Sequence, residues 1–235
     1  MSVSQKPLCV ILGGGGHARV LIDSVKSSGV ATPHAILDSD PSLWGKDLME
    51  VPIRGDDSLL PQLAHEGVTS FVVGIGSVGD SRARRQLFER GLSHGLTPLT
   101  VYHPAAVCSD WARVGEGSVL FPAAVVNAGA VLGVNVIVNT GAIVEHDCII
   151  GDHVHIATGA RLSGTVHVAN EAHIGIGSTV RQCITIGEGA IVGAGAAVVK
   201  DVEPWSVVVG VPARVVEYRQ ADKPAKSFQS HKGVA

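Results

Sequence analysis

The sequence predicts a protein of two parts, an N-terminal α/β domain and a parallel β-helix that follows it. The β-helix is predicted by an aliphatic residue at every sixth position, fifteen times without an insertion. This period fits neither the 3.6 residues of a helical turn nor the two-residue alternation of a strand. It fits a β-helix whose short strands turn a corner every six residues and complete one coil in eighteen. The fifteen positions are Val114, Leu120, Val126, Leu132, Val138, Val144, Ile150, Ile156, Leu162, Val168, Ile174, Val180, Ile186, Val192 and Val198.

A second set of positions supports the β-helix. Four residues after most core aliphatics stands a small residue, such as Ala124 or Ala142, which fits beside the large side chain inside the coil. Several glycines follow a core aliphatic directly, and we expect them at corners where the backbone bends tightly. These glycines are Gly151, Gly175, Gly187 and Gly193.

The α/β domain is predicted by a strand, a glycine run and a helix in succession. The apolar residues 8–12 are followed by a glycine run and a histidine, Gly13, Gly14, Gly15, Gly16 and His17. Residues 18–25 then have the apolar spacing of a helix. In this arrangement, backbone N–H groups at the start of the helix can receive a phosphate. Strands at 35–37 and 71–73 and a helix at 80–90 complete a Rossmann-like domain.

The ligand of the glycine run remains open between a nicotinamide cofactor, a nucleotide sugar and no ligand at all. The motif is degenerate, because Ala18 stands where the dinucleotide fingerprint has its third glycine. His17 favours the nucleotide sugar, since it adds a donor facing the same ligand. Asp38 ends the second strand, where an acid often takes a ribose hydroxyl. Gly76, after the third strand, is assigned to the same pocket.

Composition limits the remaining classes. The formal net charge of −3 gives no reason to expect nucleic acid as a partner. No apolar run is long enough to span a bilayer, and the first residues lack the features of a secretory signal. The four cysteines form no CxxC pair, which favours a reducing cytoplasm. We interpret Cys148 and Cys183 as small core residues.

Domain boundaries follow from these patterns. We predict a nucleotide-sugar-binding domain over residues 1–103, a β-helix over 104–219 and a flexible tail over 220–235. His103 and Pro104 mark the junction, because a residue before proline is held extended. The tail is polar and rich in Lys, Ser and Ala.

The histidines of the β-helix are candidates for catalysis. His155 and His173 are eighteen residues apart, so they stack on one face in successive coils. His146 follows a core valine and is flanked by Glu145 and Asp147. A histidine beside a carboxylate can act as a general base, although a solvated corner histidine fits the same pattern.

Gly164 stands eighteen residues after His146, at the same corner of the next coil. A glycine there allows close approach, and its backbone N–H could hold a developing oxyanion.

The chain resembles the bacterial sugar acyltransferases with a left-handed β-helix, over residues 8 to 216. These include the bacillosamine- and perosamine-pathway N-acetyltransferases and, more loosely, the sialic acid O-acetyltransferases. The segments that carry the resemblance are Gly13–His17, Asn139–Asp147, His153–His155 and Gly210–Arg214. The left hand of the β-helix comes from this resemblance, since the rule for parallel crossovers favours the right hand.

The resemblance implies roles for particular residues. His146 matches the base, Asp147 its partner acid and Gly164 the amide that faces the thioester carbonyl. His155 matches a second active-site histidine, which we assign with Gly164 and His173 to acetyl-CoA. Asn139, Asp38, Gly76 and the glycine run with His17 match the nucleotide-sugar pocket. Glu145 leaves open which acid orients His146.

The function implied is acetyl-CoA-dependent N-acetylation of a UDP- or GDP-linked amino sugar by a cytoplasmic homotrimer, with sites between subunits and no metal. One alternative is a sugar O-acetyltransferase. Another is a γ-type carbonic anhydrase, although no two histidines here have the five-residue spacing of its ligand pair. A third is a catalytically silent, nucleotide-sensing scaffold.

Overall fold

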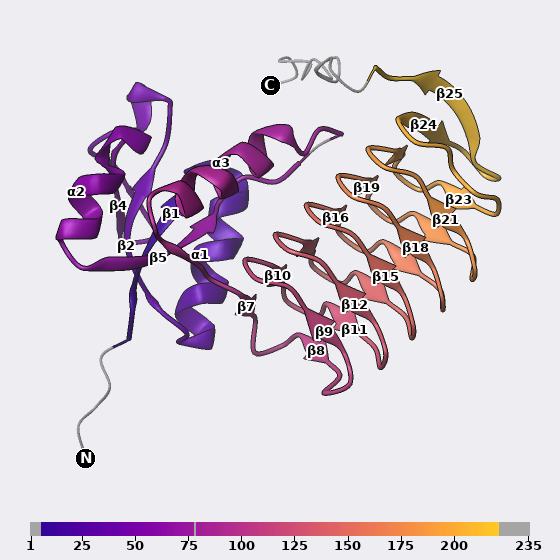
Figure 1. Cartoon of the computed structure of the whole chain (residues 1–235), viewed down its shortest axis with the longest axis horizontal. Coiled ribbons are helices and arrows are strands. Elements are labelled where there is room, and N and C mark those ends of the chain that lie inside the picture. The colour runs from indigo at the N-terminus through magenta and orange to yellow at the C-terminus, as the bar shows by residue number, and fades with distance from the viewer. Residues whose placement is uncertain (1–5, 78, 221–235) are drawn as a thin grey trace, which may run out of the picture.

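The computed structural model of the chain describes residues 6–77 and 79–220. Figure 1 shows an N-terminal α/β domain beside a long stack of short strands, and the two parts lie against each other. This is the predicted fold class, a Rossmann-like domain followed by a left-handed parallel β-helix. The predicted tail lies almost wholly outside the described residues.

The sheet of the α/β domain has the strand order β3-β4-β2-β1-β5-β6, in which only the β3–β4 pair is antiparallel. Helix α1 packs on one face of this sheet, whereas α2 and α3 pack on the other. The elements are β1 (Leu8–Leu12), α1 (Gly16–Ser28), β2 (Thr32–Leu37), the 3-10 turn Pro41–Leu43, β3 (Asp47–Leu48), β4 (Val51–Gly55), the 3-10 turn Asp57–Leu59, α2 (Leu60–His65), β5 (Val68–Val73), α3 (Arg82–Ser93) and β6 (Thr97–Pro98).

Helix α3 begins two residues later than the sequence predicts. The carboxylate of Asp80 accepts hydrogen bonds from the backbone N–H and the guanidinium of Arg82, so Asp80 lies outside the helix. At the other end α3 continues beyond Arg90 to Ser93.

Over the described residues the β-helix has three faces of parallel two-residue strands. Each strand pairs with the strand eighteen residues away, as Val119 does with Ile137. The first face holds β7 (Val101–Tyr102), β10 (Val119–Leu120), β13 (Ile137–Val138), β16 (His155–Ile156), β19 (His173–Ile174), β22 (Ile191–Val192) and β24 (Ser206–Val209), with β25 (Arg214–Tyr218) antiparallel beyond it.

The other two faces follow the same rule. The second face holds β8 (Val107–Cys108), β11 (Val125–Val126), β14 (Ile143–Val144), β17 (Arg161–Leu162), β20 (Thr179–Val180) and β23 (Ala197–Val198). The third face holds β9 (Arg113–Val114), β12 (Val131–Leu132), β15 (Ile149–Ile150), β18 (His167–Val168) and β21 (Thr185–Ile186).

The predicted six-residue series forms the core of this prism. All its members from Leu120 to Val198 are buried together with the small residues such as Ala124, Ala142 and Ala160, while Val114 packs partly buried against them. Burying a valine, leucine or isoleucine side chain contributes about 1.5–3 kcal/mol, so this single column accounts for much of the stability.

The four corner glycines of the prediction lie at corners, but for a different reason than expected. None of them has the left-handed φ of a tight bend. A Cβ added to Gly151, Gly175, Gly187 or Gly193 would instead lie 2.3–2.7 Å from an atom of the neighbouring coil. Close stacking of coils therefore requires glycine here, whereas positive φ occurs at other corner positions, including Gly141 and Asp147.

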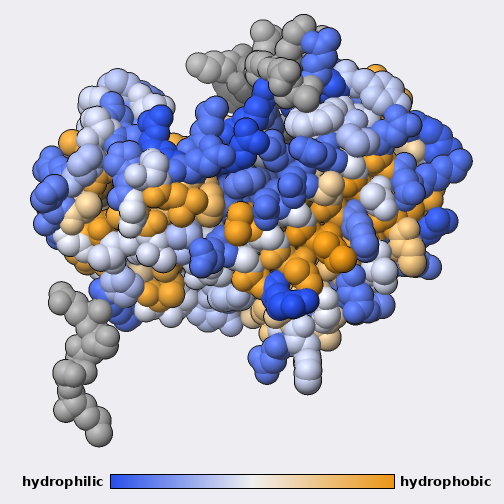
Figure 2. Space-filling view, viewed as in Figure 1, coloured by the Kyte–Doolittle hydropathy of each residue, from blue (hydrophilic) through white to orange (hydrophobic). Residues whose placement is uncertain are grey.

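The α/β domain covers the first face of the β-helix. Side chains of α1 share one buried cluster with Val101, Val119, Phe121 and Ile137 of that face. The outer sides of the other faces carry exposed apolar residues, including Val107 and Ile149. Figure 2 shows an apolar band along the strands of the β-helix.

The cysteines match the prediction only in part. All four lie in the described part of the chain and are free, and Cys148 is buried in the core as expected. Cys183 is exposed, so the interpretation of it as a core residue is wrong. It lies in a corner with a φ of 59°, outside the core series.

Candidate active site

The glycine run connects β1 to α1, as predicted. Gly13 has a φ of 106°, and a Cβ there would lie 2.4 Å from Cγ2 of Ile75, so both conformation and space require glycine. Gly15 is the N-cap of α1. Apart from neighbours in the chain and the backbone of α1, no described atom lies within 4 Å of a Cβ added to Gly15 or Gly16. These two backbone positions are therefore open to a ligand at the positive end of the helix dipole.

Asp38 lies directly after β2 and contacts the glycine run. Its Oδ2 accepts a hydrogen bond from the Gly14 N–H at 2.6 Å, and its Oδ1 accepts one from Asp40 at 2.9 Å. The sequence thus placed this acid correctly at the edge of the loop. Its carboxylate holds Gly14 in place, a contact that the sequence did not predict.

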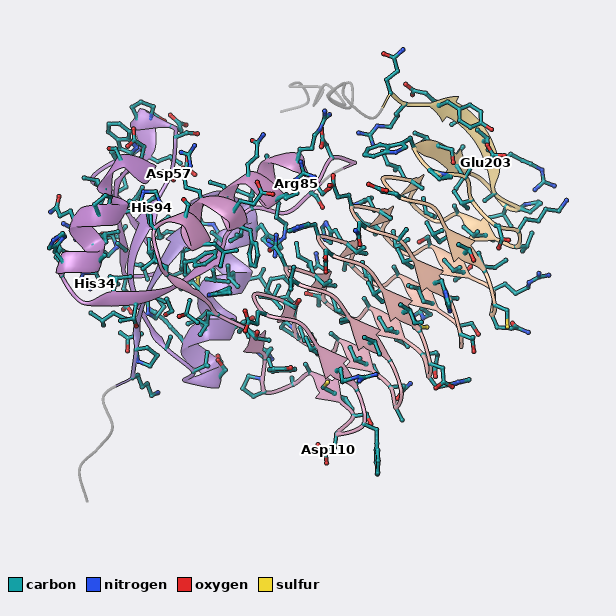
Figure 3. All side chains as sticks on the ribbon, in the orientation of Figure 1. His34, Asp57, Arg85, His94, Asp110 and Glu203 are labelled. Carbon is teal, nitrogen blue, oxygen red and sulfur yellow. The ribbon has the colours of Figure 1, made fainter. Side chains whose placement is uncertain are left out.

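A cavity of about 260 Å³ opens beside the loop, with Gly13 and Asp38 on one side and α3 on the other. Arg90 of α3 donates to Asp57 across this cavity at 2.7 Å, and Asp57 can be found in Figure 3. The lining residues are Gly13, Leu37, Asp38, Ser39, Asp57, Ile75, Ala83, Gln86, Leu87 and Arg90.

Three histidines form a buried group between the α/β domain and the first face of the β-helix. His155 and His173 stack in successive coils as predicted, with ring centroids 5.1 Å apart. His17 joins them from the start of α1, 6.3 Å from His155. Gly76 lies between His17 and His155, since an added Cβ would be 3.5 Å from one ring and 3.6 Å from the other.

His155 is fixed through both ring nitrogens. Its Nδ1 lies 2.7 Å from the carbonyl oxygen of Ser77, and its Nε2 lies 3.2 Å from the side-chain nitrogen of Asn139. These contacts bring together predicted residues of the nucleotide pocket and of the β-helix. Ser77, which the sequence analysis did not single out, is 78 residues away from His155 in the chain.

Burial keeps this histidine group neutral at pH 7. Desolvation by burial, followed by the charge of Arg84, lowers the pKa of His17 to about 4. Burial lowers the pKa of His173 to about 4 as well. The pKa of His155 is well below its ordinary value, again through burial first and the neighbouring His173 second. A neutral imidazole can donate one hydrogen bond through its N–H and accept one at its other ring nitrogen.

His146 lies on a different side of the β-helix. It belongs to the turn between β14 and β15, at the corner where the second face meets the third. We call this column of turns the His146 corner. Asp110 occupies the same column two coils away and is labelled in Figure 3, on the side away from the α/β domain. The first face, which carries His155 and packs against α1 with His17, is the face opposite to this corner.

The immediate surroundings of His146 resemble a base with its partner. Its Nδ1 lies 2.9 Å from Oδ2 of Asp147. Glu145 instead accepts a hydrogen bond from the backbone N–H of His146, at 3.3 Å. The acid that contacts the ring is therefore Asp147. Gly129 makes room for it, because a Cβ there would lie 2.4 Å from Asp147 Oδ1.

The ring of His146 lies directly over Gly164 of the next coil. A Cβ on Gly164 would be 2.4 Å from Nε2 and 2.5 Å from Cε1 of the ring. Among the described residues, no hydrogen bond reaches the Gly164 N–H, whereas its carbonyl accepts one from Cys183. A free backbone donor thus lies beside the ring nitrogen that Asp147 leaves unbound.

Sequence reasoning missed several residues around these sites. Ser77 and Phe121 belong to no motif, and they are close to the histidines only because distant segments pack together. Gly129 was also missed, although the eighteen-residue repeat places it one coil before Asp147. Arg84 is fully buried. The sequence could have predicted the burial of Arg84, because Arg84 stands four residues before the buried Phe88 and so lies on the same face of the helix.

Comparisons with known proteins agree with this architecture. Residues 9–91 match the family model of the PglD N-terminal domain. A perosamine N-acetyltransferase from Caulobacter crescentus, solved with CoA and GDP-perosamine, is 37% identical with a TM-score of 0.84, and the match covers 92% of this chain and 98% of that one. No curated protein sequence matches the chain.

Two further structures extend the match. The acetyltransferase domain of PglB from Neisseria gonorrhoeae, solved with acetyl-CoA, is 37% identical over 90% of this chain and 100% of that one, with a TM-score of 0.82. WeeI from Acinetobacter baumannii is 27% identical, with a TM-score of 0.77, and the match covers 90% of this chain and 100% of that one.

The fold and the site define the class of hexapeptide-repeat acyltransferases with a left-handed β-helix. Within this class, the chain belongs to the family of sugar N-acetyltransferases that carry a PglD-type N-terminal domain. The predicted family and the predicted enzyme class are thereby confirmed.

Proposed function

We propose that the protein transfers an acetyl group from acetyl-CoA to the amine of a nucleotide-linked amino sugar. The observation that carries this proposal is His146, bonded to Asp147 through Nδ1 and lying with Nε2 over the free backbone donor of Gly164. The relatives solved with GDP-perosamine and CoA, and with acetyl-CoA, support the two substrates.

The geometry of His146 suits direct attack of the amine on the thioester. As the new C–N bond forms, the amine must lose a proton, and Nε2 of His146 accepts it. Asp147 holds the tautomer in which Nε2 is free and stabilises the imidazolium. The Gly164 N–H stabilises the oxyanion. The C–S bond then breaks, and CoA leaves as a thiol with the proton from His146.

The nucleotide part of the amino-sugar substrate fits the α/β domain. The open positions Gly15 and Gly16 receive the diphosphate, while Asp38 and the cavity beside it hold the nucleoside. Gly13, Gly14 and His17 shape this loop, and Gly76 and Asn139 line the path from it to the histidine group. The assignment of His155 and His173 to acetyl-CoA stays a prediction.

The separation of these parts supports a homotrimer as part of this proposal. The nucleotide pocket lies beside the first face, whereas His146 projects from the opposite corner, so both reach one substrate only when two copies of the chain meet. Exposed apolar residues such as Trp111 and Ile149, near the His146 corner, support contact with a second copy. The sites are then between subunits.

The domain limits and the location of the enzyme are part of the same proposal. We assign residues 1–103 to the nucleotide-sugar domain and 104–219 to the β-helix, although strand β7 just before this boundary already pairs with β10 of the β-helix. Among the described residues, no helix is both long and apolar enough to cross a membrane. Free cysteines and the metabolite acetyl-CoA favour the cytoplasm.

An acetyl-transfer assay with UDP- and GDP-linked amino sugars tests the function. We expect one sugar nucleotide to gain a single acetyl group, as read by mass spectrometry, together with one equivalent of free CoA. Treatment with hydroxylamine separates the alternatives, because it removes an O-acetyl ester and leaves an N-acetyl amide. CoA release without any acetylated sugar nucleotide contradicts the proposal.

A further inference from the structure

Arg84 is a buried charge that the proposed mechanism does not use. It lies on α3 and is the largest fully buried side chain of the described residues. Burial lowers the pKa of its guanidinium to about 9, which still leaves it charged at pH 7. Because burying a charge is costly unless it is paired, a cation in this position calls for a counterpart.

No carboxylate within the described residues pairs with Arg84. Its Nη1 donates to the backbone carbonyls of Val73 at 3.0 Å and Ile75 at 2.9 Å, and its Nε donates to that of Asn135 at 3.4 Å. Its Nη2 is buried and has no partner. Carbonyl dipoles offset only part of a full charge, so the site keeps an excess of positive potential.

This charge lies directly behind the glycine run. Val73 and Ile75 flank Gly74, whose N–H donates to Leu12 O at 2.7 Å, and Ile75 contacts Gly13. Ile75 also lines the cavity beside Asp38. The charge of Arg84 also lowers the pKa of His17, at the start of α1, although burial is the larger cause.

The loop itself brings little charge to an anion. Four glycines offer only backbone N–H groups, and His17 is neutral at pH 7. In the cavity, Arg90 is already paired with Asp57. A diphosphate placed at Gly15 and Gly16 therefore has one unpaired buried cation behind it, and this cation is Arg84.

We propose that Arg84 is the counter-charge for the diphosphate of the nucleotide sugar, acting by its charge across the loop of residues 73–77 whose carbonyls it binds. This inference rests on the proposed function, because it takes a nucleoside diphosphate as the ligand. The same carbonyl bonds fix the loop that carries Ser77 to His155, so Arg84 also connects the nucleotide pocket to the histidine group.

A purely structural role would use the same three hydrogen bonds to tie α3 to β5 and to the β-helix. The two roles differ in their dependence on the charge of the ligand. A structural tie affects a nucleoside and its diphosphate alike. A counter-charge acts on the phosphates alone, and at an effective dielectric constant of about 20 a charge pair about 10 Å apart changes affinity roughly 10-fold.

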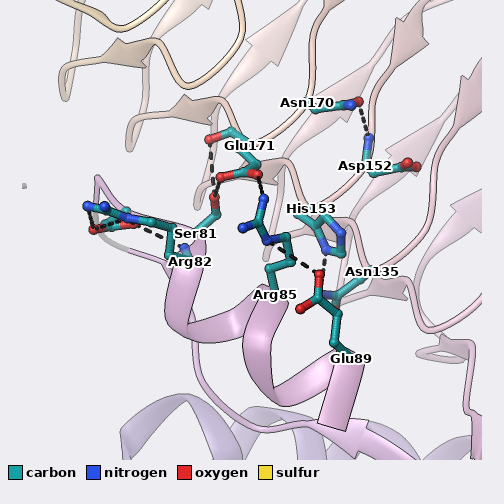
Figure 4. A network of polar contacts seen from close by, with 10 residues as sticks. Ser81, Arg82, Arg85, Glu89, Asn135, Asp152, His153, Asn170 and Glu171 are labelled. Carbon is teal, nitrogen blue, oxygen red and sulfur yellow. Dashed lines mark hydrogen bonds and ion pairs between the residues drawn. The ribbon is translucent and has the colours of Figure 1, made fainter. Parts of the chain in front are cut away.

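Arg85 provides a matched control on the same helix. It also crosses to the β-helix, where its Nη1 donates to Glu171, which accepts from Ser81 as well (Figure 4). It therefore ties the same two parts together, but its charge is already paired with a carboxylate.

Calorimetric titration of the full chain with uridine, UMP and UDP, and with guanosine, GMP and GDP, tests the inference. For the base that the parent protein prefers, we expect Arg84→Met to weaken the diphosphate about 10-fold and the nucleoside less than 2-fold. Arg84→Lys should keep most of the preference for diphosphate, and Arg85→Gln should keep all of it. If Arg84→Met does not fold, Arg84→Gln, neutral but still a donor, takes its place.

An equal loss for nucleoside and diphosphate in the neutral variant overturns the inference and leaves Arg84 as a structural tie. A parent protein that binds neither UDP nor GDP contradicts the proposed function itself. The two failures are therefore distinct.

Discussion

The two histidine sites lie on opposite sides of the β-helix, and their surroundings differ in solvent exposure. His17, His155 and His173 lie between two packed domains, where burial keeps them neutral. The His146 side chain is 61% exposed, with the Asp147 carboxylate beside its ring and Gly164 of the next coil next to it. The comparison teaches that one residue type serves two purposes here. The buried group orders a pocket, whereas the exposed one is open to a substrate.

The largest effect is expected from removing His146. His146→Ala leaves the core untouched, because the side chain projects from a corner, so folding and assembly into the proposed trimer should survive. Loss of a general base lowers turnover about 10²–10⁴-fold, with both substrates still bound. Asp147→Asn should cost less, because the imidazole remains. Steady-state kinetics decide the matter, and turnover within a few-fold of the parent would make His155 the next candidate.

A side chain in the glycine run should affect one substrate only. A Cβ at Gly15 meets no described atom other than those of its chain neighbours, so the melting temperature of Gly15→Val should change little. The same atoms occupy the approach to the helix N-terminus, and we expect the Michaelis constant for the sugar nucleotide to rise about 10-fold or more. That for acetyl-CoA should stay nearly constant. Equal loss for both substrates would show that the two domains were assigned wrongly.

Acid should destabilise the fold through the buried histidines. Their pKa values are lowered on folding, so the unfolded chain binds more protons as pH falls below 6.5. Stability is therefore full above about pH 6.5 and is lost as pH falls toward 4, by on the order of 3 kcal/mol for His17.

Urea unfolding at pH 7, 5.5 and 4.5 measures this loss. His173→Gln should reduce the pH dependence of the free energy of unfolding, because it removes one of the lowered pKa values. A pH dependence equal to that of the parent protein would contradict this account.

The smallest effect is expected from removing metal ions, which should leave activity unchanged. Activity should survive a chelator, and purified protein should carry no stoichiometric zinc. Among the described residues, no group of three or more His, Cys, Asp or Glu side chains is arranged to hold a metal ion. Zinc near one equivalent per chain, lost together with activity, would favour the carbonic anhydrase alternative.

Much of the site could be predicted because its parts are close in sequence or one coil apart. His146 and Asp147 are neighbours, and Gly164 follows at the eighteen-residue repeat. Asp38 could be placed because it ends a strand beside the glycine run. By contrast, the contact of Ser77 with His155 spans 78 residues and depends on how two domains pack. No local pattern carries that information.

The sequence by itself determined the repeat, the core column and the pairs that the repeat stacks, because a coil of eighteen residues places position i over position i+18 wherever the chain lies. Only the tertiary structure decided which face of the prism the α/β domain covers. That choice depends on α1 burying its apolar side against Val119 and Ile137. The tertiary structure also buried Arg84 with no carboxylate partner among the described residues. Because the α/β domain packs on the first face, His146 lies on the side of the β-helix away from that domain. Long-range packing, and not a local pattern, therefore set the distance between His146 and the buried histidine group.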